Sequence, residues 1–192
     1  MARTNISVDQ GIFDEFSSEA ERQNKTLFAF ANESLLAVSK ISAEGGNPSN
    51  LYKMWRTVSL LREMDVVTLP SDFVDGMITQ LSTVDKASLL KAFHDLGSRL
   101  VGVLKIAADD LTELEDVAKD FAAILPIKEF RTKNNQDGTV EIDIVGAGRK
   151  MESTECVFEF LTAVLNGYGY HIMKKEINIG TIMILAGKKN TM

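Results

Sequence analysis

A short alternating segment at the start of the chain, with no second strand near it in the sequence, is the strongest constraint on the fold. Along residues 3–8, polar and apolar side chains alternate, so that one face of a strand would be polar and the other apolar. The backbone edge of a lone strand needs a partner, and a second copy of the same strand supplies one. The segment therefore predicts a homodimer formed by antiparallel pairing of two N-terminal strands.

Two amphipathic helices are expected directly after this strand. The polar residues 23–25 end the first helix, and Thr26 can cap a second one that runs to about Ile41. Each helix has only one apolar side, so the strands and helices of two subunits are expected to share one core. The apolar stripe of the first helix consists of Ile12, Phe13, Phe16 and Ala20.

Residues 1–43 resemble the ribbon-helix-helix domain, the family of the Arc, methionine and plasmid-copy-number repressors. The resemblance is carried by the alternating Ile6-Ser7-Val8, by Ala20, by the turn Asn24-Lys25-Thr26 and by Leu35. It implies a β-α-α fold in an intertwined dimer, whose two-stranded ribbon enters the major groove of double-stranded DNA.

The same resemblance implies two sets of DNA contacts. Arg3, Asn5 and Ser7 would read base edges, since Arg can pair with guanine and Asn with adenine. The start of the second helix would hold phosphates through its positive end. The residues at that position are Lys25, Thr26 and Leu27.

The charge of the chain does not favour broad nucleic-acid coating. The formal net charge is −6, so attraction to phosphates would depend on a local arrangement. A second hypothesis therefore stays open: a non-DNA assembly or ligand-binding protein that uses the ribbon-helix-helix module only as a dimer clasp.

The rest of the chain is predicted to form an α+β body. Residues 44–50 have the composition of a hinge, and residues 51–125 repeat apolar positions at helical spacing. Residues 126–192 alternate as two strands, a helix and two further strands, which predicts a small antiparallel ββαββ domain. Packed together, these two regions would serve as a sensor or oligomerisation body. Such a body is compatible with an oligomer larger than the dimer.

The sequence offers little chemistry beyond these contacts. Gly146, Gly148, Arg149 and Lys150 lie between a predicted strand and helix, where they could hold an anion or effector of unknown identity. The two histidines, at positions 94 and 171, lack a second His or Cys at ligand spacing, so no metal and no cofactor is predicted. No nucleophile, base and orienting group occur together, so we expect no enzyme.

No apolar run is long enough to cross a bilayer and the start of the chain is unlike a secretion signal, which predicts a cytoplasmic protein. Taken together, the sequence predicts a dimeric, sequence-specific DNA-binding transcriptional regulator of the repressor kind with a ligand-sensing domain.

Overall fold

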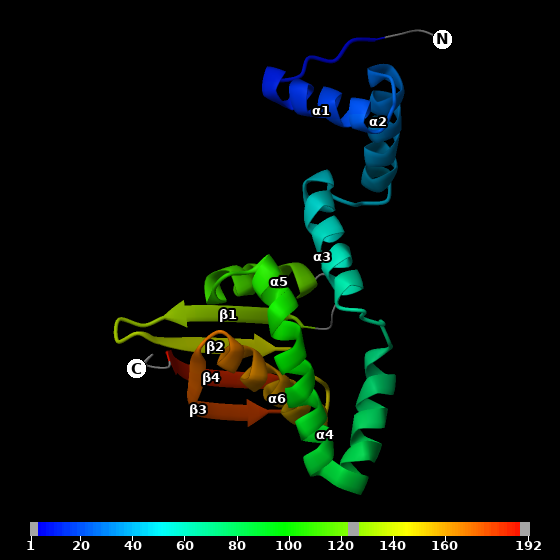
Figure 1. Cartoon of the computed structure of the whole chain (residues 1–192). Helices are drawn as coiled ribbons and strands as arrows, with labels where there is room; N and C mark the ends of the chain where they lie inside the picture. Colours follow the sequence, from blue (N-terminus) through cyan, green and yellow to red (C-terminus); the bar gives the residue numbers. More distant parts are fainter. Residues whose placement is uncertain (1–3, 123–126, 189–192) are drawn as a thin grey trace. The chain divides into compact units, whose positions relative to one another are not determined.

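The computed structural model describes residues 4–122 and 127–188, and Figure 1 shows the elements along the chain. The chain divides into two compact units, Met1–Tyr52 and Lys53–Met192. The finer division expected from the sequence, into residues 1–43, 44–50, 51–125 and 126–192, stays a prediction.

The first unit is helical. An extended segment of residues 4–9 leads into α1 (Gln10–Arg22), which is followed by α2 (Leu27–Ala43) and the short 3-10 helix η1 (Pro48–Asn50). The Asp9 carboxylate accepts from the Gly11 amide at 2.9 Å and so caps α1. The predicted cap of the second helix is confirmed, because the hydroxyl of Thr26 accepts from the amide of Ala29 at 3.2 Å.

The predicted N-terminal strand is wrong. Residues 4–9 form no strand, and every strand in the described part of the chain lies between residues 129 and 188. Those strands pair with one another, and residues 4–9 pair with none of them. The β-α-α start of the predicted fold, the ribbon-helix-helix assignment and the homodimer through N-terminal strand pairing are therefore corrected to a helical N-terminal unit.

The second unit combines helices with one antiparallel sheet, whose strand order is β1-β2-β4-β3. Its C-terminal part has the predicted order of two strands, a helix and two strands. The helix α3 crosses the boundary between the units. The elements are α3 (Leu51–Glu63), α4 (Ser71–Ala107), α5 (Leu111–Ala122), β1 (Glu129–Asn134), β2 (Thr139–Val145), α6 (Met151–Gly167), β3 (Tyr170–Asn178) and β4 (Thr181–Lys188).

The core of this unit lies between the sheet and α6. Alternate residues of β2 and β4 are buried, and the register places Ile142 opposite Ile184. The helix α6 packs against β3 and β4 and contributes Phe158, Val164 and Leu165 to the same apolar cluster. The buried strand residues are Val140, Ile142, Ile144, Ile182, Ile184 and Ala186.

The helix α4 is two helices joined at a kink. Asp85 has non-helical dihedral angles, φ −153° and ψ 86°, and its carboxylate accepts from the Ser88 amide at 2.9 Å. Asp85 therefore ends one helix and caps the next. The part after the kink packs on α6, and at Gly97 an added Cβ would lie only 2.9 Å from the Cβ of Ala163. The absence of a side chain at Gly97 thus sets how closely α4 and α6 approach.

A half-buried tyrosine joins the end of α6 to the end of α4. The hydroxyl of Tyr168 donates to the carbonyl of Ala108 at 2.8 Å, and burial raises the pKa of Tyr168 to about 12. The phenol therefore stays protonated and keeps its donor at any physiological pH.

The two edges of the sheet are protected by different means. At the β1 edge, the amide of Thr132 donates to the Glu115 carboxylate of α5 at 3.0 Å, and the Thr132 hydroxyl donates to the same oxygen. At the β3 edge, a bulge between Ile172 and Lys174 interrupts the register. Both devices oppose pairing with a foreign strand.

We predict opposite effects for two glycine substitutions in α4. Gly97→Ala should lower the free energy of unfolding by about 1–3 kcal/mol, because its Cβ meets the backbone of Phe160 and the Cβ of Ala163. Gly102→Ala meets nothing within 4 Å and should raise that free energy by up to about 1 kcal/mol. Urea denaturation followed by circular dichroism measures both, and equal effects would contradict the close contact of α4 with α6.

We also predict an acid-dependent contribution from Glu115. Burial by itself would raise the pKa of its carboxyl, but hydrogen bonds from Lys119 and Thr132 outweigh it and lower the pKa below the ordinary value. A carboxyl whose pKa is lowered by folding stabilises the protein above its unfolded pKa, and this stabilisation is lost as the pH falls through the folded value.

Glu115→Ala should therefore cost about 1–3 kcal/mol at pH 7 and flatten the loss of stability below about pH 4.5. The matched control is Asp116→Ala, since the Asp116 carboxylate also pairs with Lys119, at 3.4 Å, but is largely exposed. The control should change the free energy of unfolding by no more than about 0.5 kcal/mol. Denaturation curves recorded from pH 7 to pH 3 make the comparison, and identical profiles for the two variants would exclude the role of Glu115.

Candidate functional site

The predicted base-reading residues lie on an extended segment without sheet structure. Asn5 and Ser7 are both exposed there, and Arg3 lies outside the described residues. A two-stranded ribbon is what would have carried these side chains into a groove. Without it, the prediction of double-stranded DNA as the partner, and with it that of a DNA-binding repressor, was wrong.

The predicted phosphate contacts have structural roles at the start of α2. Lys25 pairs with the carboxylate of Glu33 at 2.5 Å, so its charge is already balanced inside the unit. The hydroxyl of Thr26 is used as the helix cap, and Leu27 is the first, half-buried residue of the helix. These contacts hold α2 in place after the turn that ends α1.

The predicted anion loop is largely bonded to itself. The amides of Gly146, Ala147 and Gly148 donate to backbone carbonyls at distances of 2.8–3.1 Å, two of them to Gly180. Any anion would therefore meet the side chains of Arg149 and Lys150, which are exposed, rather than those three amides. An effector contact at this loop stays a prediction.

The glycine at position 148 is required by packing. Its φ is +96°, and an added Cβ would lie 2.6 Å from the Cβ of Ser153 at the start of α6. The fully buried hydroxyl of Thr154 accepts from the Gly180 amide and donates to the Lys150 carbonyl, each at 2.9 Å. The Gly-rich loop that suggested an anion site therefore has a structural role: together with Thr154 it joins the start of α6 to the β3–β4 turn.

A hollow of about 300 Å³ lies beside α5 and β1. Its cations are matched by acids: the ammonium of Lys119 pairs with Glu115 at 2.7 Å, and Arg131 pairs with Glu129. Lys128 has no ion pair within residues 4–122 and 127–188, so it is the cation available to an anionic group. The near balance of charge gives the hollow little preference for an anion. It is lined by Lys119, Lys128, Glu129, Phe130 and Arg131.

The single cysteine is inert. Cys156 is fully buried in α6, and burial raises the pKa of its thiol to about 11. Because the thiolate is the reactive form, a buried thiol with a raised pKa is a packing residue. Its neighbour Glu155 pairs with Lys86 at 2.6 Å, which joins α6 to α4.

Neither histidine belongs to a described cluster of His, Cys, Asp or Glu side chains that could bind a metal ion. His94 is half-buried on α4, and His171 is exposed on β3. In the part of the chain that the structure describes, no group of three His, Cys, Asp or Glu side chains is placed to hold a metal ion. A search of the described helices also finds none with the length and apolar character needed to span a membrane.

Comparisons with known proteins give one structural likeness. No family model matches the sequence, and no curated protein matches it. Among solved structures, the chain is similar to an H-NOX protein from S. oneidensis in the Fe(II)NO ligation state, with 13% sequence identity and a TM-score of 0.47. The similarity covers 80% of this chain and 96% of that one. At this level of similarity, the function has to be argued from the chain's own residues.

Proposed function

We propose that this is an assembly protein whose N-terminal helices join copies of the chain, and whose α+β unit is the body that they bring together. It corresponds to the second hypothesis from the sequence, with helices in place of a ribbon as the connecting element. Self-association is proposed as its role in place of catalysis, and the cytoplasmic location expected from the sequence is part of the proposal.

One observation carries the proposal: the first unit buries almost none of its apolar residues. Ala20 is its single buried hydrophobic residue among residues 4–52, with 2% of its surface exposed. Ile12 is 61% exposed and Leu36 is 57% exposed, although both lie on helices. A unit of this size needs a buried core to stay folded.

Some packing exists between the two helices. The rings of Phe16 and Phe30 lie 4.5 Å apart, which joins α1 to α2. A ring pair and one buried alanine stabilise a helix pair only slightly. Burying one further Leu, Ile or Phe side chain contributes about 1.5–3 kcal/mol, so covering the exposed ones would change the stability of the unit decisively.

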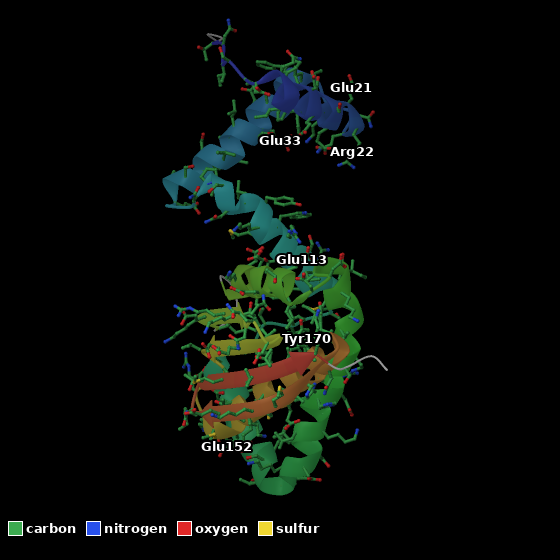
Figure 2. All side chains as sticks on the ribbon, turned by 90° about the vertical axis from the view of Figure 1, so that its left-hand side faces the viewer. Glu21, Arg22, Glu33, Glu113, Glu152 and Tyr170 are labelled. Atoms are coloured by element: carbon green, nitrogen blue, oxygen red, sulfur yellow. The ribbon has the colours of Figure 1, made fainter. Side chains whose placement is uncertain are left out.

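The exposed apolar side chains favour a second copy as the partner. Two cations of the unit are paired inside it, Arg22 with Glu19 at 2.7 Å and Lys25 with Glu33 at 2.5 Å. Figure 2 labels Arg22 and Glu33 on these two helices. Since these two cations are already paired, the apolar side chains are left as the recognition feature, and an identical apolar surface is always available on another chain.

The Fe(II)NO ligation of the compared protein is not carried over to this chain. Haem iron in sensors is held by an axial ligand such as histidine beside a slot for the macrocycle. Three residues along α4 from His94, the helix meets α6 closely at Gly97, which leaves no space for a macrocycle between these two helices at that turn. His171 lies on an exposed strand. These observations give no support for a haem site at either histidine.

We predict that the full chain self-associates and that a charge on the helices abolishes association. Ile12→Glu and Leu36→Glu should each give a monomer in sedimentation velocity runs from roughly 1 to 100 μM, because a buried unpaired carboxylate opposes the contact. The same variants should lose helical circular dichroism, since the unit needs its partner to fold.

The matched control is Val67→Glu, which changes a residue that is 76% exposed in the second unit. It should sediment like the unchanged protein. A monomer at every concentration for the unchanged chain, or association that survives in both helix variants, would refute the proposal.

A further inference from the structure

A thioether sulfur and an imidazole nitrogen, two metal-binding donors, meet over a glycine at the edge of the sheet. His171 and Met173 both belong to β3, and Gly187 lies opposite His171 in β4. The Sδ of Met173 lies 2.9 Å, and the Nε2 of His171 3.5 Å, from the point where a Cβ on Gly187 would stand. An imidazole nitrogen and a thioether sulfur therefore approach one position that holds no side chain.

The local backbone produces this arrangement. The register of β3 with β4 shifts between Ile172 and Lys174, so Met173 is the extra residue of a β-bulge. Bulges redirect side chains at sheet edges. Gly187 completes the arrangement, because any other residue would place its Cβ against both donors.

Both donors are accessible. Met173 is 58% exposed and His171 is also exposed. Among the described residues, the ring of His171 makes no hydrogen bond or ion pair, so a nitrogen lone pair is available for a ligand. Tyr170, labelled in Figure 2, marks the start of the strand that carries both residues.

We propose that His171 and Met173 bind a soft monovalent metal cation of the Cu(I) class. Thioether sulfur selects soft ions, and imidazole accepts the same ions, whereas hard cations require oxygen ligands. Both ligands are neutral, and the nearest charged positions of the two strands are Lys174 and Lys188. Positive charge beside the pair disfavours a divalent ion more than a monovalent one.

The sequence alone does not indicate this pair, because the usual metal-binding patterns consist of His and Cys at ligand spacing. Methionine is ordinarily a core residue, and the chain contains eight of them. An exposed methionine two residues from an exposed histidine, on a strand whose neighbour carries a glycine, is the signal that identifies the site.

The experiment uses Ag(I) as the probe, added to the full chain with its methionine methyl groups labelled with ¹³C. We expect Ag(I) to shift the methyl resonance of Met173 and to bind with one-to-one stoichiometry. His171→Gln and Met173→Leu should each weaken binding by at least the roughly ten- to hundredfold that even an outer-shell change costs a metal site. Gly187→Val retains both donors and should also weaken binding, because its side chain occupies the point between them.

Three control variants separate this site from other donors in the chain. Met183→Leu changes an exposed methionine of the neighbouring strand, and His94→Gln changes the other histidine. Both should bind Ag(I) like the unchanged protein, as should Cys156→Ala, whose thiol is buried. Circular dichroism confirms that each variant is folded. An unshifted Met173 methyl group, binding that survives in His171→Gln, or binding that disappears only in Cys156→Ala would overturn the proposal.

Discussion

The close contact between α4 and α6 is the constraint on which the C-terminal unit depends. At Gly97 the helix α4 approaches the backbone of α6 so closely that no side chain fits between them. That contact holds α6 against the sheet, where its apolar residues cover the buried positions of β2 and β4. The other links between these helices, Lys86 with Glu155 and Tyr168 with Ala108, lie around the same packing and depend on it.

The two units differ in how much of their apolar surface they bury. In the second unit the apolar residues form a core, the β1 edge is capped by Glu115, and the β3 edge carries a bulge beside Lys174 and Lys175. Each of these features lets the unit stay folded and separate. The first unit has a single buried hydrophobic residue among residues 4–52, Ala20, and leaves its other apolar side chains at least partly exposed. Its helices are therefore the surface through which we propose that copies of the chain associate.

Sequence patterns predicted the elements whose signals are local. The cap at Thr26 and the order of strands and helix after residue 126 both depend on neighbouring residues. The N-terminal strand was not predictable in this way, because alternation over six residues also describes an extended segment, and a strand exists only with a partner.

The contacts that carry the candidate sites are long-range, and single-sequence patterns do not reveal them. Glu115 belongs to an acidic helix start, and nothing near it in sequence indicates that its carboxylate accepts the amide of Thr132, 17 residues away. His171 and Met173 are close in sequence, but the empty position between them is created by Gly187 on another strand. Sequence analysis found the residues of the Gly146–Lys150 loop, whose amides the structure shows bonded within the protein.

If copies associate through the exposed helices of the first unit, as proposed, its folding and its association are one equilibrium. Ala20 and the Phe16–Phe30 contact are too small a core to hold two helices against the loss of chain entropy. A partner that binds only the folded form stabilises it in proportion to the logarithm of its concentration. The second unit has its own core, so its stability does not depend on a binding partner. Under the proposed self-association, the concentration of the chain would therefore control how much of its N-terminal unit is folded, and with it how many copies of the body are held together.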